Sequence, residues 1–168
     1  MTKLRRTTEN DVSRVLEIVE QGKAYLKASG VDQWQNGYPN EAVIVQDITD
    51  GYAYVLEMDG EVVGTVALSF DGEPWYDDID GAWLTEGDFL VVHRMAVHAS
   101  VRGTDAASEI LKAAGRLCEQ RGVKSIKIDT HEGNVPMQKL VKKNGFSYCG
   151  TVILGREGKR LAFEKVLG

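Results

Sequence analysis

The sequence predicts an α/β domain in which helices cover both faces of a mixed, mostly antiparallel sheet. Segments with apolar residues at helical spacing alternate with strand-like runs along the 168 residues. Asp59-Gly60 separates two strand-like runs, which is typical of a tight antiparallel hairpin. Residues 89–129 form a strand–helix–strand stretch, and such a crossover implies one parallel pair of strands.

The first half of the chain is expected to contain most of the antiparallel strands. Thr8 and Asp11 form a capping-box pattern before an apolar stripe at helical spacing. The expected elements are a strand over residues 3–8, a helix to about residue 21, a second helical stretch over 23–28, strands over 52–58 and 62–70, and an irregular loop over 72–88.

The second half holds the crossover and a final hairpin. Ile110, Ala114 and Leu117 belong to one apolar stripe, and Asn144-Gly145 is a typical helix stop. The expected elements are a strand over 89–97, a helix over 106–121, a strand over 123–129, a helix over 134–143, and strands over 146–154 and 160–166. No linker divides the chain, so we expect one domain over residues 1–168 with about seven strands and about four helices.

Composition narrows the class of protein. Apolar residues make up 43% and charged residues 27%, which is typical of a soluble globular chain. A net charge of -5 disfavours a nucleic-acid partner, and no apolar run approaches the roughly 20 residues of a membrane span. Cys118 and Cys149 lack the spacing of a zinc site, so no metal is expected. We therefore predict a cytoplasmic monomer or homodimer with neither a nucleic-acid nor a membrane partner.

The strand over 89–97 leads into a turn that is a candidate anion-binding site. Arg102-Gly103-Thr104 runs straight into a helix N-terminus, where backbone N–H groups and the helix dipole favour an anion. An ordinary strand-to-helix turn is the alternative interpretation.

Two motifs resemble those of the GNAT superfamily of N-acetyltransferases. The first is similar to that family's acetyl-CoA motif, an apolar-apolar-Val strand end followed by Arg/Gln-x-x-Gly-x-Gly/Ala; its residues here are Met95-Ala96-Val97 and Arg102-Gly103-Thr104-Asp105-Ala106-Ala107. The second resembles Asn…Leu-Tyr-x-Lys-x-Gly-Phe; its residues are Asn134 and Leu140-Val141-Lys142-Lys143-Asn144-Gly145-Phe146. The order of the expected elements also matches the family's fold across the whole chain.

The resemblance implies a GNAT-like sheet, splayed between its fourth strand (89–97) and its fifth (123–129). It implies acetyl-CoA as co-substrate, with the pantetheine arm on backbone groups of Met95, Ala96 and Val97. The resemblance also implies that Asn134 contacts that arm from the other side. The pyrophosphate would take backbone N–H groups of the anion turn, residues Arg102, Gly103, Thr104, Asp105, Ala106 and Ala107.

The sequence departs from the family pattern at two positions. Asp105 replaces a glycine; it is either a helix N-cap or a carboxylate that opposes the bound anion. Val141 replaces the tyrosine that often protonates the departing thiolate. Tyr148 is the substitute candidate if its strand presents the right face; otherwise water protonates the sulfur or the thiolate leaves as such. Both departures also suit an inactive CoA-binding module.

A general base is needed because an alkylamine, with a pKa near 10.4, is almost fully protonated at neutral pH. His93 is the best candidate, since period-two alternation puts it on the face of Met95; a core histidine is the alternative. His131 is the second choice, and His98 is expected in an exposed loop after the strand.

Acceptor recognition is expected from aromatic and acidic residues in the first half. In the family the N-terminal helices and the loop before the fourth strand build the acceptor cleft, which implies Trp34, Tyr38, Glu73, Trp75, Tyr76 and Trp83 here. The acidic segment, residues 71–88, has seven carboxylates and no Lys or Arg: Asp71, Glu73, Asp77, Asp78, Asp80, Glu86 and Asp88. It favours a cationic acceptor, although a solvated acidic loop is the alternative.

The sequence therefore predicts an acetyl-CoA-dependent N-acetyltransferase that acts on a small cationic primary amine by direct attack in a ternary complex. A protein lysine or N-terminal acetyltransferase and an inactive CoA-binding module are the alternatives.

Overall fold

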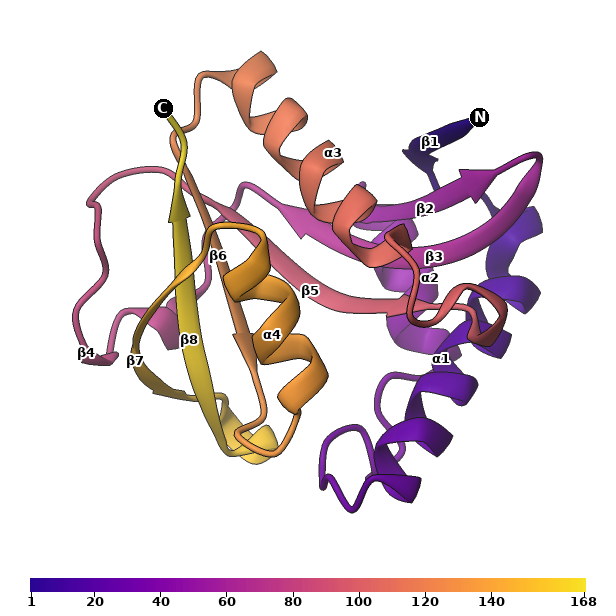
Figure 1. Ribbon diagram of the computed structural model, residues 1–168, viewed down its shortest axis with the longest axis horizontal. Coiled ribbons are helices and arrows are strands. Elements are labelled where there is room, and N and C mark those ends of the chain that lie inside the picture. The colour runs from indigo at the N-terminus through magenta and orange to yellow at the C-terminus, as the bar shows by residue number, and fades with distance from the viewer. The chain divides into compact units, whose positions relative to one another are not determined.

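The computed structural model describes residues 1–168 except the side chain of residue 156, and Figure 1 shows its ribbon. The chain divides into two units, each with its own strands, helices and core. The first unit contains Met1–Leu68 and His93–Ala113, and the second contains Ser69–Val92 and Ala114–Gly168.

The first unit is built on antiparallel strands. Its elements are β1 (Thr2–Arg6), α1 (Val12–Ala28), α2 (Glu41–Asp50), β2 (Ala53–Met58), β3 (Glu61–Ser69), the later part of β5 (Leu90–Val97) and the start of α3 (Ala106–Arg121). β1 pairs antiparallel with β2, and β2 with β3. Asp59 and Gly60 have φ of 52° and 83°, as a two-residue hairpin of mirror-image turn type requires, so the predicted hairpin is confirmed.

Helices cover both faces of these strands, as the first unit shows in Figure 1. Val15 and Val19 of α1 and Ile44 of α2 pack on Val55 of β2 in one buried cluster. Gly64 pairs with Leu56, the neighbour of Val55, and so lies on the opposite face. A Cβ at Gly64 would lie 3.0 Å from Ile110 Cδ1 of α3, so glycine lets that helix approach closely.

The helices of the first unit differ from the prediction in two ways. The separate helical stretch expected over residues 23–28 is the end of a single helix, α1, which runs through Gly22. A side chain at Gly22 would meet Trp34, since a Cβ there would lie 3.2 Å from the indole ring, and this explains a glycine inside a helix. α2 was not predicted; it begins directly after Asn40, whose side chain accepts from the Val43 N–H.

The second unit contains the crossover and the final hairpin. Its elements are β4 (Asp80–Gly81), the start of β5, the end of α3, β6 (Ser125–Thr130), α4 (Val135–Lys143), β7 (Ser147–Ile153) and β8 (Lys159–Val166). β5 pairs parallel with β6 from Leu90–Ile126 to Val92–Ile128, which confirms the predicted crossover. β6 with β8, β8 with β7, and β7 with β4 are antiparallel. The mixed, mostly antiparallel α/β fold is therefore confirmed, with eight strands rather than about seven.

The acidic segment contains regular secondary structure, whereas an irregular loop was predicted. It contains β4, and a short 3-10 turn over Pro74–Tyr76. The Glu164 carboxylate, fully buried, accepts hydrogen bonds from the Leu84 N–H at 2.6 Å and from the Thr85 hydroxyl. It also accepts from the Ser125 hydroxyl at 2.7 Å. These bonds tie the end of the segment to β6 and β8.

Among the residues that the structure describes, none of the helices has the length and apolar composition needed to cross a membrane.

Candidate active site

Strand β5 carries the candidate base and the candidate pantetheine contacts. His93, Ala96 and Val97 are half-buried, and Met95 is buried. Arg94 between them has a left-handed backbone, with φ of 51°. That conformation interrupts the period-two alternation of a strand. Period-two alternation alone therefore does not place His93 on the face of Met95, and the role of His93 as the base stays a prediction.

The Arg94 side chain connects three parts of the first unit. Its Nε and Nη2 donate to the two carboxylate oxygens of Asp47 in α2, each at 2.8 Å. Its Nη1 donates to the Tyr38 hydroxyl, also at 2.8 Å. Burial lowers the pKa of Arg94, but these hydrogen bonds and charges outweigh it and raise the pKa above its usual range. Sequence reasoning missed Arg94 and Asp47, which carry no local motif.

Trp34 reaches the same strand from the loop after α1. Its ring packs on the buried cluster of α1, α2 and β2. A Cβ at Gly22 would lie 3.2 Å from that ring and 3.8 Å from the Ala96 Cβ. The first unit therefore brings two predicted acceptor residues, Trp34 and Tyr38, to β5 beside Ala96 and Arg94.

The anion turn, residues 102–107, leads into the N-terminus of α3. Gly103 has φ of 84°, and Arg102, Thr104 and Asp105 are exposed. The Glu109 N–H donates to the Asp105 carbonyl at 2.9 Å, which places Asp105 at the N-cap position of α3. The N–H groups of the first turn of α3 follow directly, and that of Ala106 contacts the Thr104 hydroxyl at 3.3 Å. Ala106 is buried and Ala107 is half-buried.

In the second unit, Asn134 and Val141 belong to α4. The Asn134 side chain caps this helix by accepting from the Met137 N–H at 3.3 Å, and the residue is 9% exposed. Val141 is fully buried, so this position presents its side chain to the core. Tyr148 of β7 is 55% exposed, with its ring edge-on to Phe163 at 5.8 Å between centroids.

The aromatic residues of the acidic segment divide into buried and exposed ones. Tyr76 is buried, and its hydroxyl donates to Asp129 at 2.5 Å; burial and that carboxylate raise its pKa well above the usual range. The Trp83 ring packs against that of Tyr76 at a tilt of 43°, and its Nε1–H donates to the Tyr76 carbonyl at 2.9 Å. Trp75 is 52% exposed beside the half-buried Glu73, whose carboxylate accepts from the Trp75 N–H. Trp75 and Glu73 are therefore the accessible pair.

A buried ammonium lies between two rings of the second unit. Lys127 is only 4% exposed, and its Nζ lies 4.3 Å from the centroid of the Trp83 ring and 3.9 Å from that of Phe89. Burial lowers the pKa of Lys127, against the opposing charge of Glu164. The rings of Trp83 and Phe89 thus hold a cation that the chain itself supplies.

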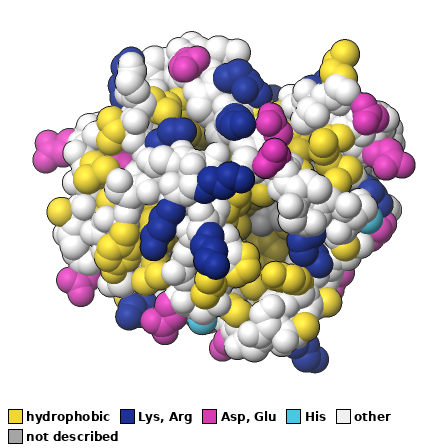
Figure 2. All heavy atoms as spheres, in the orientation of Figure 1, with side chains coloured by type: hydrophobic (Ala, Val, Ile, Leu, Met, Phe, Trp, Pro, Cys, Tyr) yellow, Lys and Arg dark blue, Asp and Glu magenta, His cyan; other side chains and the backbone are white. Residues whose placement is uncertain are grey.

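Surface charge differs between elements of the second unit. Figure 2 shows Lys and Arg side chains gathered around the region where Figure 1 draws α4. This helix carries Lys139, Lys142 and Lys143. Among the side chains that the structure describes, no group of three or more His, Cys, Asp or Glu could hold a metal ion.

This mixed α/β fold is shared with solved structures of acetyltransferases. Residues 21–146 match the Acetyltransferase (GNAT) family. The chain belongs to the GNAT family and is an N-acetyltransferase.

Solved structures agree with this assignment. A GNAT-family acetyltransferase from Streptococcus agalactiae is 34% identical over 99% of this chain and 96% of that one, with a TM-score of 0.91. An acetyltransferase from Staphylococcus aureus is 28% identical over 98% and 99% of the two chains, with a TM-score of 0.74. The aminoglycoside acetyltransferase AAC(6′)-Ib, in complex with coenzyme A, shares the fold at 20% identity over 99% and 95%, with a TM-score of 0.71. None of the curated proteins matches the sequence.

Proposed function

We propose that this enzyme transfers the acetyl group of acetyl-CoA to a small cationic primary amine. The observation that carries the choice of acceptor is the charge of the acidic segment. Six of its seven carboxylates are exposed, Glu73 is half-buried, and the segment contains neither Lys nor Arg. A protein surface whose charged groups all have the same sign raises the local concentration of an oppositely charged ligand. The exposed Trp75 adds an aromatic face, which attracts an ammonium group.

The anion turn is the proposed site for the pyrophosphate of acetyl-CoA. Backbone N–H groups at the start of α3 and the positive end of its dipole favour bound phosphate. The Arg102 guanidinium lies 4.4 Å from the centroid of the Tyr25 ring, so a cation is already positioned beside the turn. We assign the pantetheine arm to backbone groups of Met95, Ala96 and Val97, and its second contact to Asn134.

The proposed reaction is direct attack of the amine on the thioester. His93, half-buried on β5, takes a proton from the ammonium, and the neutral nitrogen attacks the carbonyl carbon. As the C–N bond forms and the C–S bond breaks, the nitrogen releases a second proton to water. The thiolate leaves with the electron pair and takes a proton from Tyr148 or from water. Both cysteines are buried, and burial raises the pKa of Cys118 to about 11. A thiol of that kind is a poor nucleophile, which favours a route without an acyl-enzyme.

Steady-state kinetics with a panel of amines test the acceptor class. At saturating acetyl-CoA, we expect kcat/KM for a cationic amine to fall steeply between low and physiological salt, where the Debye length shrinks to about 8 Å. Neutralising two carboxylates, with Glu73→Gln and Asp77→Asn together, should raise KM for the amine but not for acetyl-CoA. Two exposed acids outside the segment provide the matched control, Asp32→Asn with Glu61→Gln.

Three outcomes would overturn the proposed acceptor. A flat salt profile would remove the electrostatic contribution, and a preferred acceptor that is neutral or anionic would exclude a cationic amine. A basic peptide preferred over every small amine would favour a protein acetyltransferase.

A further inference from the structure

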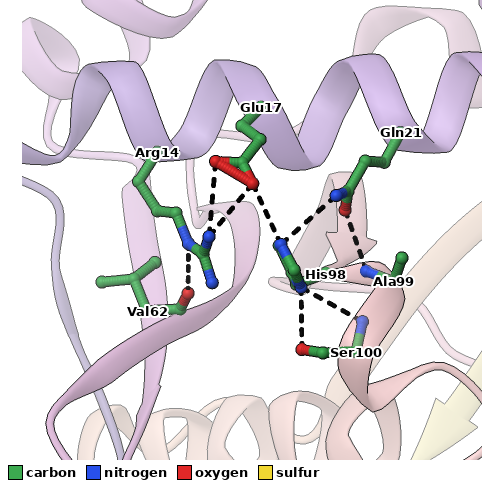
Figure 3. Close-up of polar contacts among 7 residues, drawn as sticks. All are labelled: Arg14, Glu17, Gln21, Val62, His98, Ala99 and Ser100. Carbon is green, nitrogen blue, oxygen red and sulfur yellow. Dashed lines mark hydrogen bonds and ion pairs between the residues drawn. The ribbon is translucent and has the colours of Figure 1, made fainter.

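His98 follows β5 and lies at the centre of a hydrogen-bond network in the first unit (Figure 3). Its side chain is only 16% exposed, so the expected exposed position is wrong. The network joins α1, which supplies Glu17 and Gln21, to the short 3-10 turn over Ala99–Val101. That turn leads directly into Arg102 and the anion turn.

The imidazole ring contacts both elements. Nδ1 accepts from the Ser100 N–H at 3.1 Å and lies 2.7 Å from the Ser100 hydroxyl oxygen. Nε2 lies 3.0 Å from a Glu17 carboxylate oxygen and 3.2 Å from Gln21 Nε2. The imidazole thus caps the 3-10 turn with one nitrogen and holds α1 with the other.

The partners on α1 are themselves fixed. Arg14 Nη1 lies 3.1 Å and 3.3 Å from the two Glu17 carboxylate oxygens, and Arg14 Nε donates to the Val62 carbonyl of β3 at 2.9 Å. The hydrogen bond from His98 and the charge of Arg14 lower the pKa of Glu17. Gln21 Oε1 accepts from the Ala99 N–H at 2.8 Å, so a second side chain of α1 holds the same turn.

We propose that His98, with Glu17 and Gln21, is a positioning group for the pyrophosphate of acetyl-CoA, because it holds the backbone from which the anion turn starts. The Arg102 N–H donates to the Ala99 carbonyl at 3.2 Å, and the Thr104 N–H to the Val101 carbonyl at 3.1 Å. The geometry of the turn therefore depends directly on residues 99–101. A turn held in advance loses less conformational entropy when it binds the anion. This inference rests on the proposed function, which places the pyrophosphate at residues 102–107.

Two acetyl donors separate this role from a general effect on stability. Acetyl-pantetheine has the thioester and the pantetheine arm of acetyl-CoA, but no pyrophosphate. We expect His98→Ala to lower kcat/KM for acetyl-CoA about 10-fold, equivalent to about 1.4 kcal/mol. The same variant should change kcat/KM for acetyl-pantetheine by less than about 2-fold, because this donor has no pyrophosphate whose binding the variant could weaken. The ratio of the two constants is the readout.

Two further variants keep the test sharp. Glu17→Gln weakens the network at a side chain that is 49% exposed, so it should fold even if His98→Ala does not, and it should lower the same ratio. Glu20→Gln is the matched control on the same helix, because Glu20 pairs only with the local Lys23 at 3.2 Å among its described ion pairs. It should leave the ratio unchanged.

The outcomes distinguish this inference from the function on which it rests. An equal loss with both donors would mean that the network only stabilises the fold, and no loss with either donor would mean that the network does not act on the turn; either result leaves the ratio unchanged and overturns the inference alone. If the wild-type enzyme itself did not prefer acetyl-CoA to acetyl-pantetheine, the pyrophosphate site and the inference would both be overturned.

Discussion

Arg94 and Asp47 form a two-pronged ion pair, in which two guanidinium nitrogens each lie 2.8 Å from one carboxylate oxygen. Their side chains are 17% and 10% exposed. Paired hydrogen bonds of this kind fix the direction as well as the distance between two groups. The pair joins the kinked part of β5 to α2, and through Tyr38 to the loop between the first two helices.

Removing one partner of this pair should be costly. Asp47→Ala leaves the Arg94 guanidinium buried without its counter-charge, so we expect a loss of about 3–5 kcal/mol in the free energy of unfolding. Urea denaturation measures it. Asp50→Ala, three residues further along and exposed, is the control and should cost far less. A loss below about 1 kcal/mol for Asp47→Ala would contradict a strong buried pair.

The left-handed backbone at Arg94 has its own energetic consequence. Arg94→Gly and Arg94→Ala both remove the ion pair, but only alanine keeps the Cβ that makes a φ of 51° unfavourable. The glycine variant should therefore be the more stable of the two by about 1 kcal/mol in urea denaturation. If alanine were equal or better, the strand would have relaxed to an ordinary extended backbone in both variants.

His93→Ala tests the proposed base. We expect kcat to fall about 100-fold or more, while the dissociation constant for CoA from calorimetry stays nearly constant, because proton transfer contributes about 10²–10⁴ to the rate. His131→Ala is the comparison, since that residue is the second candidate. If His93→Ala lowered the melting temperature but kept its turnover, His93 would be a core histidine.

Two substitutions of Asp105 separate its effect as a helix cap from the effect of its negative charge. Asparagine caps a helix about as well as aspartate but carries no charge, so Asp105→Asn should tighten CoA binding about 2- to 5-fold with an unchanged melting temperature. Asp105→Ala should cost about 1 kcal/mol of stability through loss of the cap. Calorimetric titration with CoA decides the first point, and unchanged or weaker binding would show that the carboxylate does not oppose the anion.

Stability should depend on pH through Asp11. A hydrogen bond from Arg5 outweighs burial and lowers the pKa of Asp11 from its ordinary 3.8 to about 2. The unfolded chain therefore takes up this proton first, so the contribution is present above about pH 4 and is lost as the pH falls to about 2. In urea denaturation, Asp11→Asn should cost about 2 kcal/mol at pH 7 and much less near pH 2.

The matched control is the exposed pair between Asp59 and the N-terminal amine, 2.7 Å apart. Asp59→Asn should have little effect at any pH, because solvent screens exposed pairs. An equal pH response in the two variants would contradict a specific role for Asp11.

The predicted fold is confirmed where local patterns are strong. The helix over residues 106–121 has a regular apolar stripe and the hairpin has its Asp-Gly turn, and both appear as predicted. α2 could not be recognised by its period, because its ten residues include many β-branched ones, which are typical of strands. The cap at Asn40 was its one clear local signal.

The candidate site was predictable only in its local parts. The anion turn is a continuous motif, so its place before α3 follows from the sequence. Arg94 and Asp47 are separated by 47 positions, and no local pattern announces either the pair or the left-handed backbone. Tyr76 and Trp83 stand among acids, which suggests exposure, yet contacts with distant strands bury the first and partly bury the second.

The ammonium group of Lys127 lies against the rings of Trp83 and Phe89, so the second unit supplies its own cation to these rings. The Trp83 ring, which the sequence predicts as a contact for the ammonium group of an acceptor, already contacts the ammonium group of Lys127, as does the Phe89 ring. Trp83 therefore serves as internal scaffolding, and Trp75 is the indole that the acidic segment leaves at the surface. Because the chain itself supplies Lys127, the contact of Trp83 and Phe89 with an ammonium group does not depend on a bound ligand.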